Sequence, residues 1–244
     1  MKNRYHLFLS GTLIMTLPLL GFSTLSHATE DTDEFEAAIK LTPNLENGRA
    51  QYRKCVTCHR PEGWGTPSGA YPQIAGQLPS VLIKQMADFR AGNRDNPIMR
   101  AFASQRSLGG PQDIADVAAY VASLPMNPNH GRGSRINLDL GRQIYERDCK
   151  ECHGAKGEGS EEDHVPKIQG QHYAYLKRQF DWIRNGRRRN ADEKMVKQIQ
   201  GYSARDEVAV LSYVSHIEPE NTAEQDWRNS HFQRYDRSWR PTAR

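Results

Sequence analysis

The chain has 244 residues, which is enough for one or two domains of ordinary size. Only 37% of its residues are hydrophobic and its mean hydropathy is -0.79, which excludes a polytopic membrane protein. The net charge is +4, and Lys2 and Arg4 in the N-terminal segment supply two of these charges, so the composition predicts no nucleic-acid partner.

The first 28 residues have the pattern of a secretory signal peptide. Two cations precede an uncharged apolar run at 7–22, and a small-x-small cleavage site follows at 26–28. An uncleaved membrane anchor is the alternative, but the run is short for a span and Pro18 interrupts it. We therefore predict cleavage after Ala28 and a mature protein that works outside the cytoplasm.

The rest of the chain contains one unit twice. GRAQYRKCVTCH at 48–59 returns as GRQIYERDCKECH at 141–153, and further segments repeat at an offset near 94. A period of this length is too long for a solenoid and predicts two tandem domains. The predicted organisation is a signal peptide at 1–28, a first domain at 29–125, a linker at 126–137, a second domain at 138–218 and an extension at 219–244.

Helix signals dominate within each unit. Helices of the first unit are expected to begin at proline and to end near Cys55, Gly92 and Pro125, at about 43–55, 79–92 and 111–125. The second unit follows the same plan, with Gly186 and Pro219 as stops and a capping box at Ser203 and Asp206. The predicted fold class is all-α.

All four cysteines lie in two C-x-x-C-H motifs, the attachment sequence of haem c. The thiols of each motif bind the haem vinyl groups and the adjacent histidine ligates the iron. The predicted attachment residues are Cys55, Cys58, Cys149 and Cys152, and the predicted iron ligands are His59 and His153.

Three other readings of the cysteines are weaker. A thioredoxin-type disulfide would need a βαβ context, and structural disulfides would not place a histidine after each pair. A four-thiolate zinc site has its two pairs about 15–20 residues apart, whereas these pairs lie in separate repeats. The sequence therefore predicts two covalently attached haem c groups.

The second axial ligands are predicted to be Met99 and Met195. Met99 lies 40 residues after His59 and Met195 lies 42 residues after His153, each between the glycine-terminated helix and the last helix of its unit. A thioether favours ferrous iron, so this ligation raises the reduction potential and closes the coordination shell. In the second unit the competing ligands are His164, His172 and Lys194.

With both motifs, both methionines and the repeated PxIxGQ segments in view, the chain resembles the di-haem cytochrome c4 family over about 48–217. That family consists of tandem class I cytochrome c domains of bacterial periplasms. The resemblance implies that the carbonyls of Pro72 and Pro166 accept the Nδ1 proton of the iron-ligating histidine, which orients its ring. It also implies that the first and last helices of each domain cross at Gly48 and Gly141.

One residue departs from the family pattern, and two aligned arginines suggest a further contact. Arg60 stands where the family usually has glycine, whereas Gly154 keeps the pattern, so we expect an altered loop over the first haem. Arg94 and Arg188 align after the glycine stops and are candidate donors to haem propionates. The alternative for them is a solvated charge run.

These observations predict a periplasmic electron carrier between respiratory redox complexes. The resemblance implies a quinol-oxidising complex or dehydrogenase as donor and a terminal oxidase or reductase as acceptor, with any membrane association running through those partners. The alternatives are a di-haem peroxidase, a thiosulfate-oxidising di-haem enzyme and a dedicated redox subunit of a periplasmic dehydrogenase. The peroxidase needs a haem that can open and the thiosulfate enzyme needs a cysteine ligand, whereas every cysteine here is used for attachment.

Overall fold

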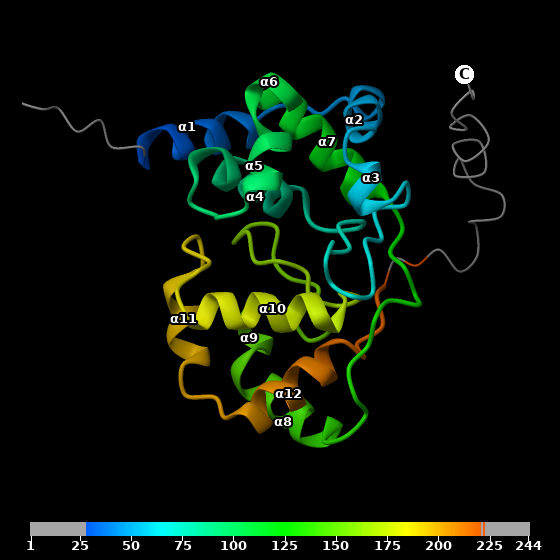
Figure 1. The fold of residues 1–244 in the computed structure, drawn as a ribbon, viewed down its shortest axis with the longest axis vertical. Coiled ribbons are helices and arrows are strands. Elements are labelled where there is room, and N and C mark those ends of the chain that lie inside the picture. The colour runs from blue at the N-terminus through cyan, green and yellow to red at the C-terminus, as the bar shows by residue number, and fades with distance from the viewer. Residues whose placement is uncertain (1–27, 221, 223–244) are drawn as a thin grey trace, which may run out of the picture.

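A computed structural model describes residues 28–220 and residue 222, so all but the last residue of the predicted signal peptide and most of the C-terminal extension lie outside the described residues. The described part is helical and has only two isolated β-bridges, which confirms the all-α prediction. Two bodies of helices lie one above the other (Figure 1). The first contains α1 (Ala28–Ile39), α2 (Leu45–Tyr52), α3 (Val56–His59), α4 (Pro79–Ala91), α5 (Pro97–Ala103), α6 (Gln105–Leu108) and α7 (Pro111–Ser123). The second contains α8 (Leu138–Asp148), α9 (Lys150–His153), α10 (Tyr173–Arg184), α11 (Glu193–Ile199) and α12 (Ala204–Val214).

Most helix boundaries follow the local signals. Helix α4 begins at Pro79 and ends before Gly92, which adopts the left-handed conformation with φ 80°. The capping box at the start of α12 is confirmed. Two expectations were wrong: α2 begins after Asn44, whose side chain caps two free N–H groups, and α12 ends at Val214, before the proline that was expected to stop it.

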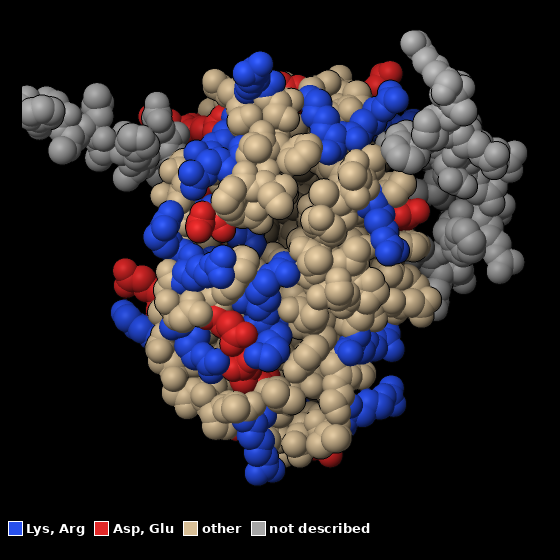
Figure 2. Space-filling model, viewed as in Figure 1, with Lys and Arg blue, Asp and Glu red and all other residues tan. Residues whose placement is uncertain are grey.

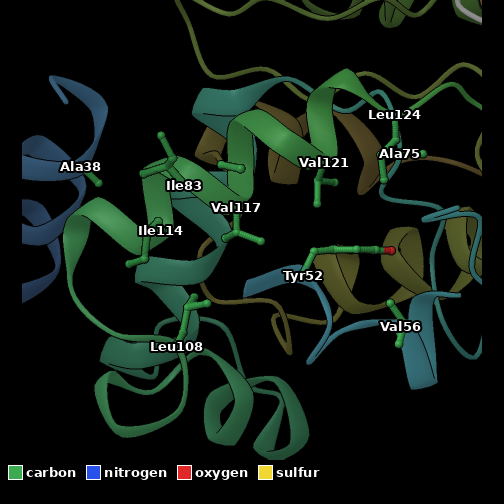
Figure 3. Close-up of a cluster of buried hydrophobic side chains, with 11 residues drawn as sticks. Ala38, Tyr52, Val56, Ala75, Ile83, Leu108, Ile114, Val117, Val121 and Leu124 are labelled. Atoms are coloured by element: carbon green, nitrogen blue, oxygen red, sulfur yellow. The ribbon is translucent and has the colours of Figure 1, made fainter. Parts of the chain in front are cut away.

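The core of the first domain forms around α7. Figure 3 shows Ile114 and Val117 of α7 in a buried cluster to which α1, α2 and α4 contribute Ala38, Tyr52 and Ile83. In the second domain the cluster centres on α8, α10 and α12, with Ile144, Tyr145, Phe180, Ile183 and Val210 among its buried members. Each domain therefore has its own hydrophobic core.

The first and last helices of each domain cross at a glycine. A Cβ atom at Gly48 would lie 2.1 Å from the carbonyl oxygen of Asp116, and one at Gly141 would lie 2.1 Å from that of Ala209. Beside each crossing two tyrosine rings pack with centroids 5.5 Å apart, Tyr52 with Tyr120 and Tyr145 with Tyr213.

A Cβ atom at either glycine would clash with backbone atoms, which cannot move aside as a flexible side chain can. Gly48→Ala and Gly141→Ala should therefore each lower the free energy of unfolding by about 3 kcal/mol. Gly201→Ala is the control, since a Cβ atom there meets nothing within 4 Å. Urea unfolding of the holoprotein measures the difference. Equal effects of the three substitutions would contradict the close helix crossing.

Helix α1 precedes the repeated unit and contacts both domains. It packs on α4 and α7, and Glu34 forms an ion pair with Arg90 of α4. The ring of Phe35 meets the edge of His164 in the second domain, with centroids 4.9 Å apart. The N-terminal helix thus lies against the junction between the domains.

The two domains also contact each other through equivalent glutamines. The side chain of Gln77 exchanges two hydrogen bonds with the backbone of Lys167, at 2.8 and 2.9 Å. Gln171 makes the same exchange with the backbone of Gln73, at 3.1 and 2.8 Å. Since Gln77 aligns with Gln171 and Gln73 with Lys167, the contact relates the repeats by an approximate two-fold axis.

The predicted linker is packed rather than extended into solvent. His172 of the second domain is fully buried, donates from Nε2 to the carbonyl of Trp64 at 2.7 Å and accepts from the N–H of Gly131 at 2.9 Å. His130 in the linker is also buried, and its Nε2 lies 2.8 Å from the carbonyl of Ser215. These contacts connect the linker to the second domain, and His172 also contacts the first domain.

Candidate haem sites

Both C-x-x-C-H motifs form the same short helical turn. Cys55 directly precedes α3 and Cys149 directly precedes α9, so each helix carries the second cysteine and the histidine. The N–H of His59 donates to the carbonyl of Cys55, and that of His153 to the carbonyl of Cys149, both at 2.9 Å. One turn of helix therefore presents two thiols and one imidazole together.

Each histidine is oriented by a proline carbonyl. Nδ1 of His59 lies 3.0 Å from the carbonyl oxygen of Pro72, and Nδ1 of His153 lies 3.0 Å from that of Pro166. A carbonyl only accepts, so the proton resides on Nδ1 and the lone pair is on Nε2. Burial lowers the pKa of both imidazoles against the raising effect of the carbonyl, which keeps them neutral and able to bind iron.

The loop after each motif has the same conformation in both domains, in contrast to the alteration expected at Arg60. Arg60 has φ 67° and Gly154 has φ 82°. The hydroxyl of Tyr52 donates to the carbonyl of Arg60, and that of Tyr145 to the carbonyl of Gly154, both at 2.7 Å. The arginine therefore adopts a backbone conformation that normally requires glycine.

Arg60→Gly should stabilise the first domain by about 1 kcal/mol, because relief of strain outweighs the greater freedom of glycine in the unfolded chain. The change is measured as a rise in the urea midpoint of the holoprotein. Gly154→Ala is the reciprocal variant and should destabilise the second domain. A destabilised Arg60→Gly protein would show that contacts of the arginine side chain matter more than the strain.

The two candidate methionines occupy equivalent positions. Met99 is the third residue of α5 and Met195 the third residue of α11, and both side chains are half-buried. The N–H of Met99 donates to the side chain of Asn96, and that of Met195 to the side chain of Asp192, both at 3.1 Å. The same cap thus sets the start of each methionine-bearing helix.

The competing groups in the second domain have other surroundings. Both ring nitrogens of His172 are hydrogen-bonded, and its ring is fully buried at the domain junction. His164 packs against Phe35 of α1. Lys194 is exposed on α11. Met195 instead packs against the hydrophobic cluster of its domain, so it remains the better candidate ligand.

Arg94 and Arg188 come together in one cluster between the domains. Arg94 donates to Gln85 at 2.7 Å, to the hydroxyl of Tyr175 at 2.8 Å and to Gln179 at 3.0 Å. Arg188 donates to Gln179 at 3.1 Å and to Gln85 at 3.3 Å. Each arginine therefore contacts a residue of the other domain, which a solvated charge run would not do.

The arginine cluster carries an excess of positive charge. Burial and the charge of Arg94 lower the pKa of Arg188 to about 9. Burial raises the pKa of Tyr175, but the charges of the two arginines outweigh it and lower that pKa. The neighbouring carboxylate of Asp88 is already paired with Lys84 at 2.9 Å. Such a site suits additional carboxylates, and haem propionates are carboxylates.

Sequence reasoning missed three residues of this cluster. Gln85 and Gln179 recur at the same place in the repeat, a signal that could have identified them. Tyr175 has Val81 at the equivalent position of the first domain, so the repeat carried no signal for it.

All four cysteines lie in the described part of the chain and none forms a disulfide. Burial raises the pKa of Cys55 to about 11 and that of Cys149 to about 12, so these thiols are poor thiolates. Within residues 28–220, no three His, Cys, Asp or Glu side chains gather as a metal site, and no helix has the length and apolarity of a membrane span.

The cytochrome c family model matches the chain twice, at residues 45–125 and 138–218. The class of protein defined by fold and site is thus a tandem c-type cytochrome with two covalently bound haem c groups. A relative from Pseudomonas aeruginosa, cytochrome c4, is 32% identical and is matched over 83% of this chain and 96% of its own length. The chain belongs to the cytochrome c4 family, whose members are electron-transfer proteins.

Two further similarities bear on function. The crystal structure of reduced cytochrome c4 from Pseudomonas stutzeri has a TM-score of 0.63 and 26% identity, covering 72% of this chain and 100% of that one. A relative from Stutzerimonas stutzeri strain A1501, a thiosulfate dehydrogenase electron acceptor, is 31% identical over 70% of this chain and 82% of its own length.

Proposed function

We propose that this cytochrome carries electrons in the periplasm between respiratory redox complexes. The donor would be a quinol-oxidising complex or a dehydrogenase, and the acceptor a terminal oxidase or reductase. The observation that carries the proposal is the repeat-matched pair of sites, each with one oriented histidine and one methionine at an equivalent helix position. Two saturated irons transfer electrons but offer no open position for a substrate.

Within this proposal the chain's own residues have separate roles. His59 and His153 would bind iron through Nε2, because Pro72 and Pro166 hold the proton on Nδ1. Met99 and Met195 would supply the second ligand of each iron, and a thioether favours the reduced state. Arg94 and Arg188 would hold propionates between the domains.

An anaerobic redox titration followed in the visible spectrum tests the carrier. Two one-electron waves, each with the spectrum of His/Met haem and without reaction with carbon monoxide, are the expected result. Ready carbon monoxide binding by the native protein would reveal an open iron and would favour the peroxidase alternative.

The arginine contacts have their own test. Arg188→Gln should lower at least one reduction potential by roughly 40 mV, about 1 kcal/mol, because it removes a positive charge that disfavours ferric iron. Arg205→Gln, at an exposed position of α12, is the matched control and should change neither potential. Unchanged potentials in both variants would remove the propionate role.

A second candidate function is that of dedicated electron acceptor for a periplasmic dehydrogenase. The relative from Stutzerimonas stutzeri that is an acceptor for thiosulfate dehydrogenase favours it. Co-purification from native membranes and periplasm distinguishes the two. A stoichiometric complex with one dehydrogenase would support the dedicated acceptor, and a free monomer would support the diffusible carrier.

A further inference from the structure

We propose that the exposed apolar face of α5 is the docking surface of the first domain for a redox partner protein. The partner's own cofactor edge would be apolar and bordered by carboxylates. This inference rests on the proposed electron-carrier function and names the partner chemistry for one of its two sites.

The apolar face consists of Ile98 and Phe102. These side chains are 59% and 43% exposed, and they stand four residues apart, on one face of the helix. Met99 is half-buried and Ala103 is buried, so these two residues mark the inner face of α5. The apolar pair therefore meets solvent directly beside the candidate iron ligand.

The second domain lacks this face although its helix is built in the same way. Helix α11 has the same cap and carries Met195 at the same position. Counted from that methionine, the residues equivalent to Ile98 and Phe102 are Lys194 and Gln198, which are exposed and polar. The fold thus does not require apolar residues at these positions. Their exposure to water in the first domain is unfavourable and does not stabilise the fold.

Two exposed arginines and one exposed carboxylate, Asp95, lie beside the apolar face. Arg100 and Arg106 are exposed, and no ion pair involves either of them within the described residues. On α11, by contrast, Lys197 lies 3.5 Å from Glu193. In Figure 2 uncharged side chains cover most of the surface over α5, with Lys and Arg side chains on several sides of it and acidic side chains at its lower left edge.

The matched spans of the two domains differ in the same direction. Residues 45–125 contain nine Lys and Arg against six Asp and Glu, whereas 138–218 contain fourteen of each. Segment 29–44 adds five carboxylates and one lysine, so the positive charge is local to α5 and α6 and does not belong to the whole first domain. An apolar face beside Arg100 and Arg106 fits a partner with carboxylates around an apolar centre. Transient redox complexes bury little surface, so a few apolar anchors supply the affinity and the surrounding charges steer the encounter.

The test uses the reduced holoprotein in stopped-flow experiments with two oxidants. Plastocyanin, an acidic blue-copper protein, is the protein probe, and ferricyanide is the small-molecule probe. The double variant Ile98→Gln/Phe102→Gln should lose about tenfold in its second-order rate with plastocyanin and change less than about twofold with ferricyanide. Arg100→Gln/Arg106→Gln should slow the plastocyanin reaction at low salt and flatten its salt dependence.

Ile136→Gln is the matched control, because Ile136 is 71% exposed in the connection between the domains. It should leave both rates unchanged. The proposal is overturned if native protein reacts with ferricyanide but not with plastocyanin, if the α5 variant keeps its plastocyanin rate, or if the control loses as much. A dimer that the α5 variant dissociates would assign the face to a second copy and also overturn it. Failure of the native protein to exchange electrons with either oxidant would instead contradict the carrier function.

Discussion

Met195→Ala should lower the reduction potential of the second haem by more than about 100 mV, because axial ligands set haem potentials over a range of about 0.8 V. Loss of the soft thioether removes the ligand that favours ferrous iron and leaves one axial position open. The variant should then bind carbon monoxide at one haem and gain some peroxidase activity. Redox titration and visible spectra of the reduced protein, with and without carbon monoxide, measure both effects.

Met86→Ala is the control for this experiment. Met86 is partly buried against the hydrophobic cluster of the first domain, so its loss should reduce stability and leave both potentials and the carbon monoxide spectrum unchanged. Met99→Ala should repeat the ligand effect at the first haem. An unchanged spectrum and potential in Met195→Ala would exclude that methionine, and His164, His172 and Lys194 would be the next residues to replace.

The double variant Cys149→Ala/Cys152→Ala should retain one covalent haem instead of two. The thioether bonds need both thiols of the motif, and all other cysteines belong to the first domain. The second domain should also lose much of its stability, because its small core is completed by the cofactor. Mass spectrometry of the denatured protein and a second unfolding transition in urea measure the two effects.

The matched variant Cys55→Ala/Cys58→Ala should give the reciprocal result, with the haem kept in the second domain. Native protein should carry two haems after denaturation and no free thiol. A free thiol at any of the four cysteines in native protein would contradict complete attachment.

Much of each site could be predicted from local sequence, because its parts are held by short-range geometry. A C-x-x-C-H motif brings two thiols and an imidazole together within one helical turn, and α3 and α9 do so in the structure. The roles of Pro72 and Pro166 were implied by the family resemblance. Each proline carbonyl accepts from a histidine only 13 residues away in the chain. The repeat itself predicted two domains, since each copy carries a full set of helix signals.

Helix ends were less predictable where two signals compete. Proline at 43 can begin a helix, but the side chain of Asn44 can satisfy two N–H groups, and the cap decides the first residue of α2. The loop after His59 gave a wrong expectation for a similar reason. Arg60 should avoid positive φ by its own preference, but the bond from Tyr52 and the packing around it hold the loop in the conformation that Gly154 adopts.

The sequence by itself determined the helical class, the two units and the residues predicted to attach each haem, because these depend on spacing within a single unit. The prolines that orient the histidines came from the family resemblance. Only the tertiary structure decided what lies between and around the units. The cluster that Arg94 and Arg188 share, the contact of α1 with the second domain and the exposure of the α5 face all depend on how the helices and domains are placed in space. Periodicity within a helix identifies its buried side, but it carries no information about which surface of another domain, or of a partner, that helix will face.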